Sequence, residues 1–268
     1  MAEPANVHDS VQPWAHDSSE YRIDFEPTPR RLRVAFGGET IADSRRAMLM
    51  LESKHLPVYY FPKADVRSDL LEASAHSSHC PFKGAASYWS VRVGELRAEN
   101  AVWSYLEPNP EAAAITGYMA FYWHKMEHWY EEDEEVFVHA RDPYKRVDVV
   151  NSSAHVQIVL GGEVVAESRR ARFLFETGLP TRYYLPRDDV RMDLLEATDK
   201  ETRCPYKGRA RYWTARAGGQ THENIVWSYP DPIPECPRIT GYLSFFNEKV
   251  DDILLDGAPM PKVETPWS

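Results

Sequence analysis

The chain has 268 residues, and its 31 Lys and Arg residues against 41 Asp and Glu residues give a formal net charge of −10. This acidic balance argues against a protein built to bind a nucleic-acid backbone or an anionic lipid surface, since both need a positive face. No run of about 18 apolar residues is present, and residues 1–20 lack the basic start and apolar core of a signal peptide. The three cysteines are too few for a disulfide framework or a multi-cysteine zinc site. We therefore expect a cytoplasmic, metal-free protein that has no cofactor and binds neither nucleic acid nor membrane.

The first half of the chain is predicted to be a series of short strands. RLRVAFGGETIADS (31–44) alternates apolar and polar side chains around a Gly-Gly pair, which supplies the positive φ that a tight hairpin turn needs. The short apolar runs AMLMLE (47–52) and VYYFP (58–62) favour strands. DVRSDLLEA (65–73) has an Asp cap and helically spaced leucines, so we expect one short helix there. The loop CPFKG (80–84) and the strands ASYWSVRV (86–93), AVWSYL (101–106) and ITGYMAFYW (115–123) follow.

The second half repeats the first. Shifted by 124 positions, residues 37–122 align without a gap with residues 161–246, and about half of the aligned positions are identical. A period of this length indicates duplication of a whole domain. Helices are too few for a parallel α/β sheet, so the predicted fold is mostly β, with two tandem antiparallel domains that each contain one short helix. The predicted parts are an N-terminal extension (1–30), a first repeat domain (31–125), an acidic and aromatic connector arm (126–153), a second repeat domain (154–250) and a C-terminal tail (251–268).

Several motifs occur in the same order in both halves, namely ADSRRA (42–47) and AESRRA (166–171), CPFKG and CPYKG (204–208), and VWSY followed by ITGY. Through them the chain resembles the family called domain of unknown function 427, from about Arg31 to Lys249. The resemblance implies the twisted-sheet fold called the β-tent, which is shared by methionine sulfoxide reductase B and the drug-binding domain of cereblon. Many β-tent proteins hold zinc through two Cys-x-x-Cys pairs. This sequence has no such pair, so we expect no structural zinc.

Cys80 and Cys204 are candidates for chemistry, because each is followed three residues later by a lysine, Lys83 or Lys207. A neighbouring ammonium group can lower the pKa of a thiol and so create a nucleophile. The alternative is a small buried side chain at the end of a strand, since free cysteine is among the most buried residue types. The sequence leaves both interpretations open.

Two arginine pairs, Arg45 with Arg46 and Arg169 with Arg170, follow the predicted hairpins. Neighbours on a strand point to opposite faces, so only one arginine of each pair can face a pocket. Its guanidinium group could hold a carboxylate or a phosphate through two hydrogen bonds. The alternative is pairing inside the domain, with Glu52 and Glu176 or with Asp65 and Asp189.

Aromatic residues recur at equivalent positions in the two halves. The candidates are Tyr59, Trp89, Trp103 and Tyr105 in the first half and Tyr183, Trp213, Trp227 and Tyr229 in the second. A dense aromatic cluster in a small domain is usually core. However, the spacing Trp-x-Tyr places both rings on one face of a strand, so the rings could instead line a cleft. The resemblance implies a cage for a flat or cationic ligand.

The leading functional prediction is binding of an unidentified small molecule in an aromatic-lined cleft of one or both repeats, with an arginine as the anion grip and the CPxKG loop at the rim. The alternatives are a thiol- or lysine-dependent enzyme acting through that loop and a non-catalytic interaction scaffold. Whether the protein is an enzyme stays open. Arg209 and Arg211 replace Ala85 and Ser87 near the second loop, so we expect the second pocket to be the more positive.

Overall fold

The computed structural model describes residues 21–262 and residue 265. By its internal contacts the chain divides into two compact units, residues 1–142 and residues 143–268. Residues 1–20, which make up most of the expected N-terminal extension, lie outside the described residues, as does the end of the expected tail. No helix within the described ranges is long and apolar enough to cross a membrane.

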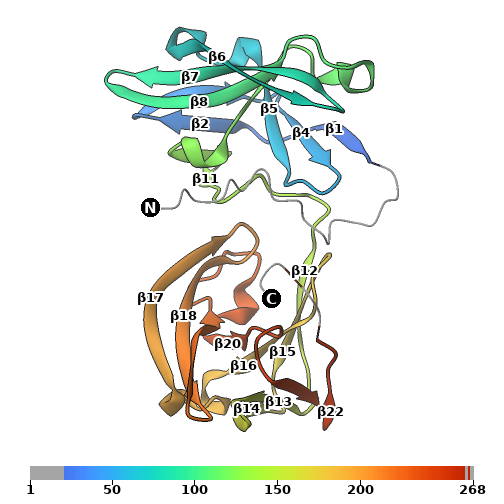
Figure 1. The fold of residues 1–268 in the computed structure, drawn as a ribbon, viewed down its shortest axis with the longest axis vertical. Helices are drawn as coiled ribbons and strands as arrows, with labels where there is room; N and C mark the ends of the chain where they lie inside the picture. Colours follow the sequence, from blue (N-terminus) through green and yellow to red (C-terminus); the bar gives the residue numbers. More distant parts are fainter. Residues whose placement is uncertain (1–20, 263–264, 266–268) are drawn as a thin grey trace. The chain divides into compact units, whose positions relative to one another are not determined.

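The first unit contains two antiparallel sheets (Figure 1). The larger has seven strands in the order β1-β4-β5-β9-β8-β7-β6, and the smaller has four in the order β11-β10-β2-β3. The strands are β1 (Ile23–Pro27), β2 (Leu32–Phe36), β3 (Glu39–Ser44), β4 (Met48–Glu52), β5 (Val58–Pro62), β6 (Leu71–Cys80), β7 (Gly84–Val93), β8 (Leu96–Tyr105), β9 (Tyr118–Phe121), β10 (His128–Glu131) and β11 (Glu134–Glu135). The strands predicted at 47–52 and 58–62 are confirmed as β4 and β5.

The second unit has the same strand order, so the prediction of two tandem, mostly β, antiparallel domains is confirmed. Its sheets run β12-β15-β16-β20-β19-β18-β17 and β14-β13-β21-β22. The strands are β12 (Val147–Asn151), β13 (Val156–Leu160), β14 (Glu163–Ser168), β15 (Arg172–Glu176), β16 (Arg182–Pro186), β17 (Leu195–Cys204), β18 (Gly208–Ala217), β19 (Gln220–Ser228), β20 (Tyr242–Phe245), β21 (Asp252–Leu255) and β22 (Ala258–Pro259). Figure 1 shows the long strands β17 and β18 side by side.

The structural repeat is longer than the stretch that aligns most clearly in the sequence. Strands β1 and β12 start 124 residues apart, at 23 and 147, and β11 and β22 also start 124 residues apart, at 134 and 258. Residues 126–153 therefore supply the last two strands of the first repeat and the first strand of the second. Strands β21 and β22 lie in the region expected to be a tail.

Helical structure is limited to short 3-10 turns among the described residues. They are η1 (Lys63–Asp65), η2 (Ser68–Leu70), η3 (Pro110–Ile115), η4 (Trp123–Lys125), η5 (Arg187–Asp189), η6 (Met192–Leu194) and η7 (Pro237–Ile239). The segment 65–73, predicted as one short helix, begins at the end of η1, forms the 3-10 turn η2 and then enters β6 at Leu71. The pairing of β6 with β7 along its length explains why the helix ends so early.

The predicted Gly-Gly hairpins form between β2 and β3 and between β13 and β14. Gly161 and Gly162 have φ values of 62° and 78°, a region that residues with a side chain rarely adopt. A Cβ atom on Gly161 would also lie 2.5 Å from the carbonyl oxygen of Ala217. Glycine is thus required at position 161 both by the turn and by the close approach of β18.

The alternation of side chains along the strands gives each seven-stranded sheet two different faces. One face packs against the four-stranded sheet and forms the main core, which contains Val34, Ile41, Phe61, Val102 and Phe121 in the first unit. The opposite face, which we call the aromatic face, carries a second cluster of buried side chains. In the first unit it includes Met50, Tyr60, Tyr88, Trp103 and Tyr105, and in the second Leu174, Tyr184, Tyr212, Trp227 and Tyr229.

Candidate functional site

A buried ion pair borders the aromatic face of the first unit. Lys83, in the CPFKG turn between β6 and β7, donates through Nζ to the carboxylate of Glu52 at the end of β4, and both side chains are 8% exposed. Tyr21 donates its hydroxyl to the same carboxylate and stacks on Phe82 with ring centroids 3.5 Å apart. Burial and then the hydrogen bond to Glu52 raise the pKa of Tyr21, so this hydroxyl stays neutral. One ammonium group therefore faces one carboxylate.

The second unit repeats this pair and adds a cation. Lys207 donates to Glu176, and the two side chains are 11% and 5% exposed. Lys145, which occupies the position equivalent to Tyr21, also pairs with Glu176, with Nζ 3.5 Å from the carboxylate oxygen. Two ammonium groups therefore surround a single carboxylate.

Lys207 stays protonated in this setting. Its burial lowers the pKa of the amine, but the neighbouring Cys204 and Glu176 outweigh burial, and the pKa ends above its ordinary value. A lysine that acts as a nucleophile must be the neutral amine. The environment of Lys207 therefore favours an ion-pair role over a nucleophilic one.

Tyrosine and tryptophan side chains hydrogen bond to each other on the aromatic faces. The indole N–H of Trp103 donates to the hydroxyl of Tyr60 at 3.4 Å, and Trp227 donates to Tyr184 at 3.1 Å. Burial raises the pKa of Tyr60, Tyr184 and Tyr105. These phenols are therefore neutral groups that can accept and donate hydrogen bonds.

The two predicted cysteines each lie at the edge of an aromatic cluster. Cys80 and Cys204 are half-buried and pack against the aromatic clusters of their own units. The second cluster also contains Cys236, which is 2% exposed, where the first has Ala112. Burial raises the pKa of the Cys236 thiol to about 11.

The structure divides the predicted aromatic residues between the two faces of the large sheet. Trp103 and Tyr105 lie on the aromatic face, as do their equivalents Trp227 and Tyr229. The residues that pack in the main core instead are Tyr59, Trp89, Tyr183 and Trp213. Adjacent residues on a strand point to opposite faces, so the neighbours Tyr60 and Tyr88 join Trp103 in their place. The aromatic side chains predicted to line one cleft therefore do not all lie on the same face of the sheet.

Three of the four arginines, Arg45, Arg46 and Arg170, form ion pairs within their own domains, and Arg169 lines a pocket. Arg46 pairs with Asp65, and Arg170 donates through Nε and Nη2 to Asp189 at 3.0 and 2.7 Å. Arg45 lies 3.7 Å from a carboxylate oxygen of Glu132, with both side chains more than half exposed. Of the alternatives open in the sequence, internal pairing with the aspartates is the one that the contacts support.

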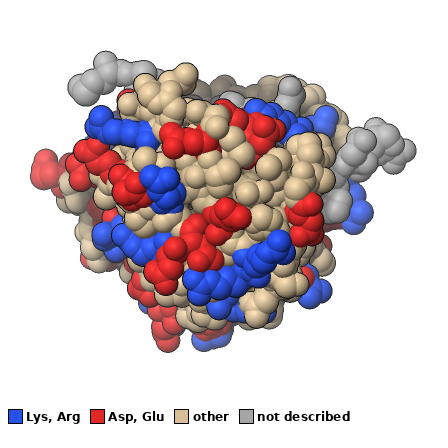
Figure 2. All heavy atoms as spheres, turned by 90° about the horizontal axis from the view of Figure 1, so that it is seen from below, with Lys and Arg blue, Asp and Glu red and all other residues tan. Residues whose placement is uncertain are grey.

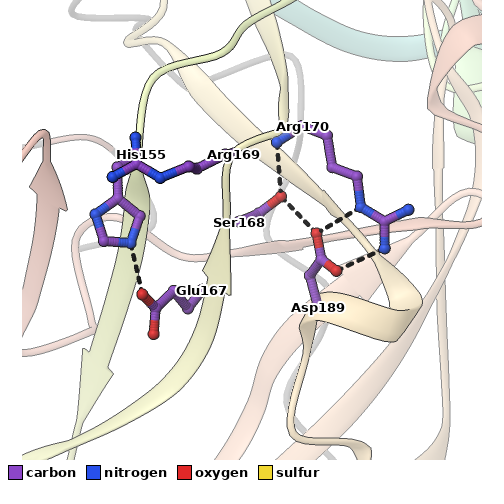
Figure 3. Close-up of a pocket in the computed structure, with 6 residues that line it drawn as sticks. All are labelled: His155, Glu167, Ser168, Arg169, Arg170 and Asp189. Atoms are coloured by element: carbon purple, nitrogen blue, oxygen red, sulfur yellow. Dashed lines mark hydrogen bonds and ion pairs between the residues drawn. The ribbon is translucent and has the colours of Figure 1, made fainter.

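An open pocket of about 420 Å³ lies beside Arg170 in the second unit (Figure 3). Its lining residues are His155, Glu167, Ser168, Arg169, Arg170 and Asp189. His155 Nε2 is 2.6 Å from Glu167, and Ser168 donates its hydroxyl to Asp189 at 2.6 Å. None of the lining residues belongs to the aromatic cluster. The predicted anion grip and the aromatic walls therefore do not share this pocket.

The aromatic face of the second unit holds polar groups where that of the first is apolar. Arg182, at the position of Val58, donates two hydrogen bonds of 2.8 and 2.6 Å to Glu248, and its guanidinium carbon lies 5.7 Å from the ring centroid of Trp227. Ser244, at the position of an alanine in the first unit, is fully buried, and its hydroxyl has no hydrogen-bond partner among the described residues. The two faces are thus chemically different.

The carboxylates that pair with the lysines were not predicted in that role. Glu52 and Glu176 end the apolar runs of β4 and β15 and point to the same face as Met50 and Leu174. A carboxylate on a buried face needs a cation. The alternation of side chains along these two strands therefore predicts that both glutamates are buried, and a buried glutamate needs a neighbouring cation such as lysine.

The Arg182–Glu248 pair makes the stability of the second unit depend on pH. Burial raises the pKa of Glu248, but hydrogen bonds from Arg182 and Thr265 outweigh it and hold the pKa below its ordinary value. A depressed carboxyl pKa stabilises the fold above the unfolded value of about 4.3, and this contribution is lost as the pH falls through the folded value. We expect Glu248→Gln to lower stability at neutral pH and to flatten the loss on acidification, measured by urea unfolding at a series of pH values.

The exposed Glu223→Gln is the control for this experiment, since Glu223 has no ion-pair partner within the described ranges. It should leave the acid side of the profile unchanged. An unaltered profile in Glu248→Gln would mean that other carboxylates cause the acid sensitivity.

In the described part of the chain, no three His, Cys, Asp or Glu side chains are grouped so that they could hold a metal ion.

A family model described as Domain of unknown function (DUF427) matches residues 24–132 and 148–256. These two segments cover more than half of the chain and follow the structural repeat closely. No curated protein matches the chain.

Proposed function

The chain belongs to the DUF427 family, and we propose that it binds a small molecule on the aromatic face of one or both repeats. One observation carries the proposal: each aromatic cluster is bordered by a buried lysine–glutamate pair and contains tyrosine hydroxyls bonded to an indole N–H. Packing does not need these groups, because apolar residues of similar volume often replace a buried ion pair without loss of stability. Polar groups that converge among aromatic rings are typical of ligand sites.

The second repeat is the better equipped for a ligand with a negatively charged or hydrogen-bonding group. Its aromatic face offers the guanidinium group of Arg182 and the hydroxyl of Ser244. Arg172 adds a further cation, 4.2 Å from the ring centroid of Tyr242. A planar anion could stack on the rings and bond to these groups. The equivalent side chains of the first repeat, Met48, Val58 and Ala120, favour an uncharged ligand.

The other functions predicted from the sequence receive less support. Lysine-dependent catalysis needs a neutral amine, whereas Lys207 is held as an ammonium by its neighbours. Nucleic-acid binding needs a continuous positive surface. On the face shown in Figure 2, basic and acidic side chains alternate. We also propose that each unit has the β-tent fold and that the protein is cytoplasmic. If no ligand binds, the interaction scaffold is the expected function.

A thermal-shift screen of the whole protein against a metabolite library rich in aromatic carboxylates and phosphates tests the proposal. At one hundred times its Kd, a ligand stabilises the fold by about 2.7 kcal/mol, which raises Tm by several degrees. We expect at least one such ligand. Ser244→Ala, which copies Ala120 of the first repeat, should keep the fold and weaken binding to the second repeat. A screen without any shift in either repeat would overturn the proposal and favour the scaffold.

A further inference from the structure

Two substitutions that distinguish the second repeat from the first lie near the CPYKG turn that begins at Cys204. Lys145 replaces Tyr21, and Cys236 replaces Ala112. Lys145 lies beside Tyr206 of that turn, with Nζ 5.5 Å from the ring centroid, and Cys236 lies in the cluster against which Cys204 packs. Lys145 shares Glu176 with Lys207, and the charge of Lys207 acts on both Cys204 and Cys236.

The backbone holds the two cysteine segments together. The amide of Lys207 donates to the carbonyl of Cys204 at 3.4 Å, and the amide of Ile233 donates to the carbonyl of Lys207 at 3.1 Å. The amide of Cys236 then donates to the carbonyl of Ile233 at 2.9 Å. Cys236 lies within the aromatic cluster of the second unit, and Cys204 packs against the same cluster. The two thiols are therefore held beside one apolar cluster by a continuous set of backbone hydrogen bonds.

The charges of the ion pairs beside the CPYKG turn do not balance. Two ammonium groups, those of Lys145 and Lys207, face the single carboxylate of Glu176. In the first repeat, Lys83 and Glu52 balance, because Tyr21 is neutral. Reactive cysteines lie in electropositive surroundings, and the second repeat has one more cation beside its CPYKG turn than the first has beside its CPFKG turn.

The two cysteines also differ in access. Cys204 is half-buried, whereas Cys236 is 2% exposed. A reagent in solution therefore meets Cys204 first, and Cys236 can react only with a group already inside the cluster.

We propose that Cys204 and Cys236 form a dithiol that hydrogen peroxide oxidises, with Cys204 as the nucleophile and Cys236 as the resolving thiol. The Cys204 sulfur attacks a peroxide oxygen. The S–O bond forms, the O–O bond breaks, and water leaves with the thiol proton, so that Cys204 becomes a sulfenic acid while peroxide is reduced. Cys236 then attacks the Cys204 sulfur. The S–S bond forms, the S–O bond breaks, and the oxygen leaves with the proton of Cys236 as a second water. The first repeat cannot complete this cycle, because Ala112 stands where Cys236 does.

Peptide mapping of the reduced full-length protein after treatment with hydrogen peroxide tests the proposal. Remaining thiols are blocked with N-ethylmaleimide before trypsin digestion under non-reducing conditions. We expect a disulfide between peptides 204–207 and 217–238 within one chain, while Cys80, in peptide 68–83, stays reduced under the same treatment. The bond needs Cβ atoms about 4 Å apart. Absence of the linked peptides, or equal oxidation of Cys80 and Cys204, would overturn the proposal.

Three variants separate the roles of the groups. Cys236→Ala, which copies the first repeat, should abolish the linked peptides and leave a Cys204 sulfenic acid that dimedone traps. Lys145→Tyr, which copies Tyr21, should slow oxidation of Cys204 roughly tenfold, because it removes the excess positive charge. Lys54→Tyr is a matched lysine-to-tyrosine change in the first unit and should have no effect. Unchanged oxidation in Lys145→Tyr would refute the charge argument, and a loss in Cys236→Ala of dimedone trapping at Cys204 would refute its role as nucleophile.

Discussion

Replacing Glu176 with leucine is expected to destabilise the second unit by about 3–5 kcal/mol, the usual cost of leaving a buried charge without its partner. The side chain of Glu176 is 5% exposed and faces both Lys207 and Lys145. Without the carboxylate, two ammonium groups would lie close together with no anion between them. Hydrogen exchange measured by mass spectrometry can follow the two units separately, and we expect faster exchange in the second unit alone.

The first unit supplies the matched control. Glu52→Leu leaves only one lysine, Lys83, without its partner, so its effect should be large but smaller than that of Glu176→Leu. A double variant, Lys83→Met with Glu52→Leu, should recover much of the loss, because apolar groups can replace both members of a buried pair. A change below about 1 kcal/mol in both single variants would show that water reaches these pairs freely and that they behave as surface ion pairs.

Trp103→Ala and Trp227→Ala are each expected to cost about 3–5 kcal/mol of unfolding free energy, as large-to-small changes in a core do. The two tryptophans are 8% and 7% exposed and each donates to a buried tyrosine hydroxyl. The similar burial predicts similar losses. Chemical denaturation of each variant, with hydrogen exchange to assign the affected unit, measures them.

Trp103→Phe and Trp227→Phe separate the ring from its N–H group. Each keeps most of the packing and loses one hydrogen bond, so a loss of about 1 kcal/mol is expected. Markedly unequal losses in the two alanine variants would contradict the equal burial and would indicate that one aromatic face opens in solution. That face would then be the one to examine first with ligands.

The sequence alone determined the duplication, the antiparallel β architecture and the positions of the Gly-Gly hairpins. These features depend on local patterns that need no tertiary information. An alternating apolar run makes a strand, and a pair of glycines permits positive φ at its turn. The repeat at 124 residues then implies that both halves fold alike, and the strand orders agree with this. The sequence determined the boundaries of the two repeats less well, because strands β1, β10 and β11 differ in sequence from their counterparts β12, β21 and β22.

Only the tertiary structure decided which side chains share a face and which charges meet. In VYYFP two successive tyrosines look equivalent, yet Tyr60 joins Trp103 while Tyr59 faces the other sheet. The choice depends on which face of β5 packs on the four-stranded sheet, and no short-range pattern contains that information. Likewise, Lys83 and Glu52 are 31 residues apart, and strands β5, β9 and β8 lie between β4 and β7 in the sheet. They meet because the β6–β7 turn brings Lys83 to the aromatic face, to which Glu52 also points. Sheet order alone does not predict such a contact, so the partner of a buried charge is known only from the tertiary structure.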